Sequence, residues 1–261
     1  MTSDALPRRT PGSWERAIYA IELQRKGLAR LGSGVTALAD EGRHLRAWLT
    51  SADAAAWRRP TRCAEWNVRD VVAHLASGEL YNQACVHDDI ASLGEWADDE
   101  AYNVGQVEMR RHLSHRDVFA EWDERHRDVV AAWGAMDPAD PLTTSWGPYL
   151  VGLQAWHIAS EYATHADDIG VPVPAERAAS RLDWRLAFSQ YAVEECELGL
   201  TVEPAEGDSV LVRDGAGAGA ELVLTREQFV AAVSARLPYD AVADDPAVHA
   251  LLRRMTVLVG P

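Results

Sequence analysis

Apolar residues recur every three or four positions along most of the chain, the spacing of helices with one buried face. Glycine and proline interrupt this spacing and mark where helices end. The pattern predicts helical segments over residues 13–31, from Gly34 to about 50, after Asn67, over about 102–133, over about 149–169 and over about 175–199. Residues 87–100 are acidic and poorly periodic, so we expect a loop there.

The segment after Asn67 has the clearest helix start. Asn67 is a good N-cap, and Asp70 three residues later complements the exposed amides and the helix dipole. The apolar positions that follow define a buried face, and His74 lies on its flank. The sequence therefore predicts that His74 is held by a well-anchored helix.

The pattern changes after Gly199. Residues 209–213 and 221–224 favour short strands around a Gly/Ala-rich turn at 214–219, and helices fit 225–237 and 246–256. We therefore predict a mainly α fold with three units. These are an N-terminal helical extension over 1–32, a helical bundle over 33–201 and a small α+β domain over 202–261.

Composition narrows the classes of function. The chain has 261 residues and a formal net charge of −15, which disfavours binding to nucleic acid. It has no apolar run near the ~20 residues of a membrane span. The basic N-terminus has no apolar segment after it, so we expect no signal peptide and a cytoplasmic location. The three cysteines have no CxxC spacing, which argues against a disulfide framework or a zinc knuckle.

Polar residues at helical spacing supply the candidate chemistry. Glu161 and His165 are four residues apart, and Asp168 and His157 share their helix face with apolar residues. A buried Glu, His and Asp need something to neutralise the carboxylates, and a divalent cation bound together with His74 would do so. Alternatively, these residues are hydrogen-bonded core residues without a metal ion. For His157 three roles are open: a fourth ligand, a substrate contact or a core histidine.

Other candidates carry less chemistry. Cys63 precedes a helix start, where the dipole stabilises a thiolate, but no histidine adjoins it in sequence. Four of the ten tryptophans could wall a cavity, although filling a core is the more usual role: Trp66, Trp96, Trp146 and Trp156. We interpret His112 and His115 as part of a solvated face. The chain has neither a glycine-rich phosphate loop nor a GxSxG motif.

Three segments carry a resemblance to a known family. The run from Pro60 to Leu75, PTRCAEWNVRDVVAHL, resembles the Pro-Thr-x-Cys-x-x-Trp signature that ends in Ala-His-Leu in the mycothiol-dependent maleylpyruvate isomerase family. That family belongs to the DinB-like metal-binding four-helix bundles. Its third-helix and fourth-helix patterns are matched by Tyr102-Asn103 with Val107 and Arg110-Arg111, and by Trp146-Gly147 with Glu161, His165 and Asp168.

The resemblance implies a DinB-like four-helix bundle with a metal ion, typically zinc, held by His74, Glu161 and His165. It also implies mycothiol as a co-substrate. From their place on the same helix face, His157 and Asp168 are candidate catalytic residues, which either orient a ligand imidazole or act as a base. Candidate substrate-binding residues are Trp66, Asn103 and Trp146.

The function implied is a metal-dependent, mycothiol-dependent isomerase or S-transferase acting on an electrophilic small molecule. Both reactions begin with attack by a thiolate, so the sequence does not separate them. A metal-assisted hydrolase, a thiol-exchange enzyme of secondary metabolism and a non-catalytic small-molecule-binding protein remain alternatives. Whether a C-terminal arginine reaches the site, and which one, is also open, the candidates being Arg213, Arg226, Arg236, Arg253 and Arg254.

Overall fold

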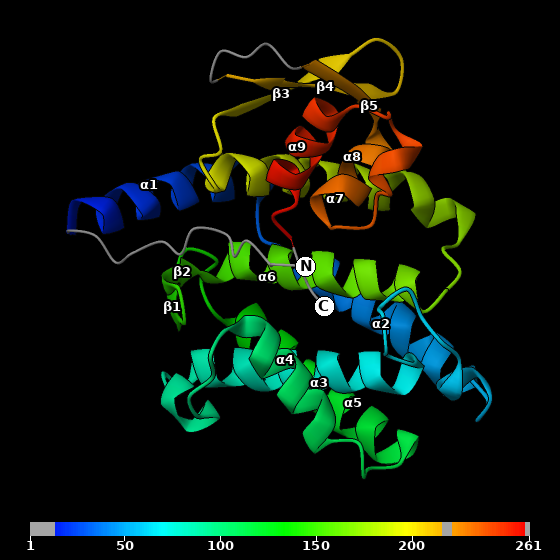
Figure 1. Ribbon diagram of the computed structural model, residues 1–261. Coiled ribbons are helices and arrows are strands. Elements are labelled where there is room, and N and C mark those ends of the chain that lie inside the picture. The colour runs from blue at the N-terminus through cyan, green and yellow to red at the C-terminus, as the bar shows by residue number, and fades with distance from the viewer. Residues whose placement is uncertain (1–13, 216–220, 259–261) are drawn as a thin grey trace.

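Helices form most of the chain in the computed structural model, which describes residues 14–215 and 221–258 (Figure 1). Residues 1–13 lie outside the described residues, as do 216–220 of the predicted turn. The start of the predicted N-terminal extension and the segment for which we expect no signal peptide fall in 1–13. The helices up to the C-terminal part are α1 (Trp14–Leu31), α2 (Val35–Ser51), η1 (Ala56–Arg58), α3 (Val68–Val86), η2 (Ile90–Leu93), α4 (Asp99–Met109), α5 (His115–Ala135), α6 (Val151–Asp168) and α7 (Ala175–Glu195).

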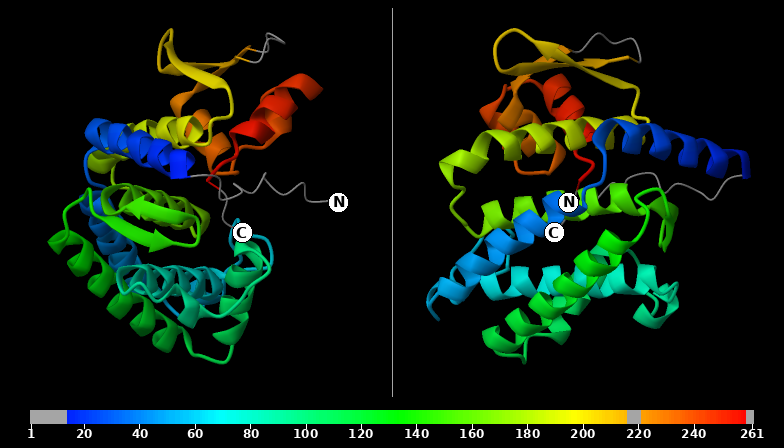
Figure 2. Two further views of the ribbon diagram at one scale, coloured as in Figure 1. Left: turned by 90° about the vertical axis from the view of Figure 1, so that its left-hand side faces the viewer. Right: turned by 180° about the vertical axis from the view of Figure 1, so that it is seen from behind.

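The elements are stacked in layers (Figure 2). Helix α6 runs through the middle, with α1 and α7 above it and α3, α4 and α5 below it (Figure 1). Helices α2, α3, α5 and α6 pack on one another and share one apolar core, which holds Leu45, Val72 and Trp122 among others. The prediction of a mainly helical fold with a small C-terminal sheet is confirmed.

The start of α3 follows the local prediction. The Asn67 side chain accepts a hydrogen bond from the Asp70 amide, and the Asp70 carboxylate accepts one from the Asn67 amide. This reciprocal capping box satisfies amides that the first helical turn leaves without partners. The cap fixes the start of the helix that carries His74, which lies one turn after Asp70.

Two local predictions in the bundle need correction. The helix expected from about Tyr149 begins at Val151, because a hairpin of β1 (Pro141–Thr144) and β2 (Gly147–Leu150) precedes it. Gly147 has a φ of 106° after the turn, a conformation that suits glycine. The helix expected over 102–133 is two helices, because Ser114 and Asp117 form a second capping box that starts α5.

The C-terminal part is a three-stranded antiparallel sheet with two helices. The strands run in the order β3 (Leu200–Ala205), β4 (Ser209–Asp214) and β5 (Glu221–Thr225), followed by α8 (Arg226–Val233), η3 (Tyr239–Ala241) and α9 (Pro246–Met255). The sequence pattern missed β3, which crosses the predicted boundary at residue 202. The second apolar core reaches back to Val193 on α7. Because β3 crosses the predicted boundary and the second core includes a residue of α7, the division into three units remains a proposal.

Helix α1 is tied to the bundle by a buried side chain. The Gln24 amide donates a hydrogen bond to the Pro148 carbonyl and accepts one from the Leu150 amide, so α1 is linked to β2. Among the described residues, no helix is long and apolar enough to cross a membrane.

Candidate metal centre

Three side chains from α3 and α6 converge between these helices. One possible ligand atom from each of His74, Glu161 and His165 lies within 4.8 Å of the other two. The closest pair is His74 Nε2 and Glu161 Oε1, 2.8 Å apart. The rings of His74 and His165 meet edge to face with their centroids 4.9 Å apart. The spacing of four residues on α6 thus places Glu161 and His165 on one side of the helix, opposite His74.

The ionisation of these groups suits a cation. Burial lowers the pKa of His165, which favours the neutral imidazole that a metal ion requires. Burial alone would raise the pKa of Glu161, but the hydrogen bond with His74 and the proximity of three histidines outweigh it and lower that pKa. Two imidazoles and one carboxylate form a ligand set found in catalytic zinc sites. The residues present therefore fit a divalent ion.

Asp168 orients one of the imidazoles. Nδ1 of His165 donates a hydrogen bond to Asp168 Oδ2 at 3.1 Å, which leaves Nε2 as the nitrogen for a metal ion. A carboxylate behind a ligand histidine fixes the tautomer and the ring orientation. The structure thus places Asp168 behind the ligand set.

Arg236 is the C-terminal arginine that reaches this site. Its Nε and Nη2 donate to Asp168 Oδ1 and Oδ2 at 2.9 and 2.8 Å. Burial would raise the pKa of Asp168, but His165 and Arg236 hold it well below its usual range. The arginine lies in the loop after α8, and no local sequence signal distinguished it from the other candidates. Three of those have other partners: Arg213 pairs with Glu203 and Glu221, Arg226 with Asp183 and Asp208, and Arg254 with Asp214.

Cys63 joins the same cluster, which the sequence analysis did not expect. Its thiol donates to Asp168 Oδ2 at 3.4 Å and lies 3.6 Å from His165 Nδ1. Cys63, His165 and Asp168 also lie close enough to hold an ion. However, burial raises the pKa of Cys63 to about 11, and the Arg236 cation is 3.7 Å from its sulfur. A protonated thiol beside a cation is a poor metal ligand, so we favour the set with His74.

His157 has its hydrogen-bond partners in a second polar cluster, beside the ligand set. Its Nε2 lies 2.9 Å from the hydroxyl of Tyr149 and 3.4 Å from Glu195. The Tyr149 hydroxyl donates to Glu195, so His157 Nε2 carries the hydrogen in this arrangement. Its Nδ1 has no hydrogen-bond partner among the described residues. His157 therefore stands one turn before Glu161 with one nitrogen open to exchange a proton.

The predicted substrate-binding residues lie in different surroundings. Trp66 is buried, and its ring centroid is 5.2 Å from that of His74, so it walls the cluster. Trp146 lies in the β1–β2 turn with 66% of its surface exposed, and Asn103 is half-buried on α4. Within the described part of the chain, no hydrogen bond or ring contact connects Asn103 or Trp146 with the ligand set.

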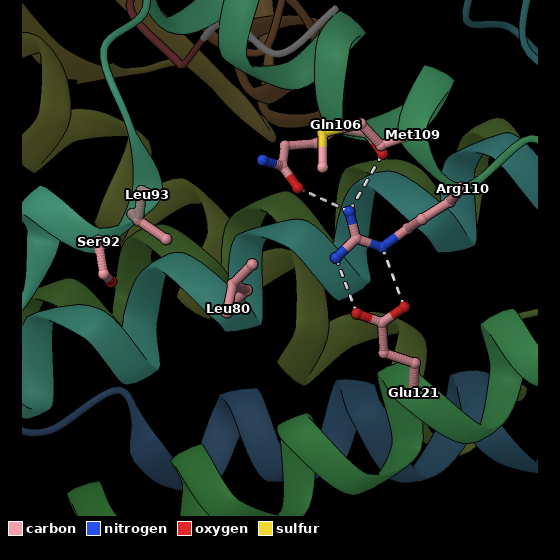
Figure 3. A pocket seen from close by; sticks show the side chains of 7 residues that line it. All are labelled: Leu80, Ser92, Leu93, Gln106, Met109, Arg110 and Glu121. Atoms are coloured by element: carbon pink, nitrogen blue, oxygen red, sulfur yellow. Dashed lines mark hydrogen bonds and ion pairs between the residues drawn. The ribbon is translucent and has the colours of Figure 1, made fainter.

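A hollow of about 350 Å³ lies between α3, η2, α4 and α5. Its charged groups are engaged with each other (Figure 3). The Arg110 guanidinium donates to both oxygens of Glu121 and to Gln106, while Leu80, Leu93 and Met109 supply apolar walls. This ion pair holds α4 to α5, and the hollow presents no unpaired charge from Arg110.

Fold and side chains together define a helical protein with a His-Glu-His cluster on two facing helices, in which both histidines are buried. The family model of the mycothiol maleylpyruvate isomerase N-terminal domain matches residues 38–170, slightly more than half of the chain. The chain therefore belongs to this family. The match includes all three candidate ligands but ends before the C-terminal sheet.

Two solved structures are also similar to this chain. They are a crystal structure of the mycothiol-dependent maleylpyruvate isomerase and one of a histidine-to-alanine variant of it. Each shows 17% identity and a TM-score of 0.49, with 60% of this chain and 68% of the other covered. No curated protein matches the chain.

Proposed function

We propose that this protein is a metal-dependent enzyme that uses a low-molecular-weight thiol, mycothiol, to attack an electrophilic small molecule. The observation that carries the proposal is the convergence of His74, Glu161 and His165 within 4.8 Å. Membership of the mycothiol maleylpyruvate isomerase N-terminal domain family supports the choice of thiol. The reaction is an isomerisation or an S-transfer, since both begin with the same attack. A reducing compartment such as the cytoplasm suits a thiol co-substrate.

The metal ion in this proposal, most simply Zn²⁺, is held by His74, Glu161 and His165. When bound, a divalent ion supplies the positive charge that stabilises the thiolate form of an incoming thiol. Three protein ligands leave room for such an incoming group. Asp168 holds the His165 ring in its binding orientation, and Arg236 holds Asp168 in turn.

Three other residues have roles around the metal ion in this proposal. Because the pKa of Asp168 is well below its usual range, Asp168 stays ionised and serves to position His165 rather than to accept a proton. We assign proton transfer to His157, whose Nε2 is fixed by Tyr149 and whose Nδ1 is available. Trp66 excludes water from the His74 side of the site.

The experiment that tests the ligand set is elemental analysis of the purified protein and of matched variants. His74→Ala and His165→Ala should each lose the bound metal while the helical circular dichroism is retained. His112→Ala, an exposed histidine on the loop before α5, should keep it. Stoichiometric metal in both ligand variants would contradict the assignment.

The experiment that tests the reaction supplies mycothiol together with maleylpyruvate and follows products by mass spectrometry. Conversion of the substrate with the thiol regenerated supports an isomerase, and accumulation of a conjugate supports an S-transferase. A hydrolysis product that forms equally well without thiol indicates metal-assisted hydrolysis and contradicts the proposal. Binding without turnover of this and other thiol acceptors indicates a binding protein and contradicts it as well.

A further inference from the structure

A second hollow, of about 280 Å³, lies between the start of α2, α6 and α7. In Figure 2 the link from α1 to α2 passes beside α6 and α7 in this region. The hollow is lined by Trp156, Trp184, Arg177, Arg181 and Glu41, among others. None of these residues belongs to the candidate metal centre.

This hollow lies on the opposite side of α6 from the metal ligands. Arg181 lines the hollow and bonds α6 through the Ala163 carbonyl and the Asp167 carboxylate. Asp167 follows His165 by two residues, which turns it by about 200° around a helix with 3.6 residues per turn. A ligand bound in the hollow would therefore not touch the metal centre.

The charged network beside the hollow has an excess of positive charge. Arg177 and Arg181 both donate to Glu41, and Arg181 and Arg185 both donate to Asp167. Three guanidinium groups thus meet two carboxylates in this network, of which Arg177, Arg181 and Glu41 line the hollow itself. Asp40, also on the rim, is paired separately with Arg43 and leaves this balance unchanged. An unbalanced cation inside a chain of net charge −15 favours an anionic ligand.

Arg177 has an unused hydrogen-bond donor at this place. Its Nη2 donates to Glu41 at 3.0 Å, whereas its Nη1 is buried and has no partner among the described residues. A buried donor without a partner costs free energy that an added acceptor recovers. In addition, α2 begins beside the hollow with Gly34 as its N-cap and no acidic residue in its first turn, and only the neutral Ser33 hydroxyl accepts from the Val35 amide there, which leaves the local field favourable to an anion.

Two tryptophans provide the apolar part of the hollow. The rings of Trp156 and Trp184 lie 5.5 Å apart at an angle of 36°. Trp156 is fixed by a hydrogen bond from its Nε1 to the Gly32 carbonyl and by stacking on Phe188. A planar ring packs well against such faces, and offset aromatic contacts add to its affinity.

From these observations we infer that the hollow between α2, α6 and α7 binds a small aromatic carboxylate, with Arg177 receiving the carboxylate and Trp156 and Trp184 receiving the ring. The site is separate from the proposed thiol chemistry and does not depend on it.

The test is calorimetric titration of the full chain with benzoate, with benzamide as the uncharged ring and acetate as the charge without a ring. We expect saturable binding of benzoate, roughly ten-fold tighter than binding of either analogue. Arg177→Gln should weaken benzoate binding by a similar factor, and Arg177→Lys should recover part of it. Glu41 keeps Arg181 as a partner in both variants, so the fold should survive, which circular dichroism verifies.

Two further variants locate the bound benzoate. Arg58→Gln, an exposed arginine on η1, is the matched control and should bind as the unmodified protein does. His74→Ala should also retain binding, because it alters only the metal centre. Loss of binding in His74→Ala with retention in Arg177→Gln would move the ligand to the metal centre and overturn the inference. No saturable binding, or equal affinity for benzamide, would overturn it too.

Discussion

Arg236 and Asp168 form a two-point ion pair, with Nε to Oδ1 at 2.9 Å and Nη2 to Oδ2 at 2.8 Å. This pair joins the loop after α8 to the end of α6 and so connects the C-terminal part with the candidate metal centre. Asp168 in turn accepts from His165 Nδ1. The C-terminal part thereby takes part in the orientation of a proposed metal ligand.

The chain of contacts behind His165 predicts that Asp168→Ala lowers metal affinity without removing a ligand. Loss of the partner of a ligand histidine typically costs about 10–100-fold in affinity. Competition with a chelator measures this, and Asp128→Ala, an exposed residue on α5, serves as the control. Equal affinity in Asp168→Ala and in the control would contradict the orienting role.

A buried network in the bundle core predicts that Tyr162→Phe destabilises the protein. The Tyr162 hydroxyl donates to Glu79 and accepts from Trp122 Nε1, so its removal leaves both groups buried and short of a partner. We expect a loss of about 1–3 kcal/mol in the free energy of unfolding, measured with urea. Tyr81→Phe should cost less, because its hydrogen bond with Ser145 is exposed to water. Equal losses in the two variants would rule out the buried network as the cause.

The space around two helical glycines, Gly42 on α2 and Gly78 on α3, predicts opposite effects when each is replaced by alanine. A Cβ on Gly42 would lie 1.9 Å from Nε2 of the buried His126, so Gly42→Ala should destabilise the protein by about 1–3 kcal/mol. A Cβ on Gly78 of α3 meets no atom within 4 Å, so Gly78→Ala should stabilise it by up to ~1 kcal/mol. Thermal unfolding measures both. A melting temperature for Gly42→Ala at or above that of the unmodified protein would contradict the packing.

The ion pairs of Glu121 predict a pH-dependent contribution to stability. Burial alone would raise the pKa of Glu121, but Arg110 and Arg125 outweigh it and lower that pKa below its ordinary 4.5. A carboxyl with a lowered folded-state pKa stabilises the fold above the unfolded-state pKa and loses this contribution as pH falls through the folded-state pKa. Glu121→Gln should therefore cost about 1 kcal/mol at pH 7, a value for a partly exposed pair.

The same variant should cost progressively less below pH ~4.5, until it matches the unmodified protein in acid. Urea unfolding at several pH values measures this difference, with Glu124→Gln, exposed on the same helix, as the control. A loss that stays constant from pH 7 into the acid range would show that the effect of Glu121 is not electrostatic.

Local predictions succeeded where the cause is local. The capping box of Asn67 and Asp70, the strands β4 and β5 and most helix positions follow from residues a few places apart. The β1–β2 hairpin and strand β3 were missed because each is short and has a weak apolar alternation. Their pairing depends on a partner strand more than on their own residues.

In the candidate site, too, some relationships follow from local sequence and others only from tertiary packing. The sequence by itself determined that Glu161 and His165 share one helix face, because four residues make about one turn. Only the tertiary structure decided that His74 meets them and that Cys63 lies beside His165. It also decided that Arg236, and not another C-terminal arginine, reaches Asp168. The hydrogen bond between His157 and Tyr149 was likewise decided by packing. These contacts depend on how whole elements pack and on where loops place their ends, and the spacing of residues along the chain does not specify either.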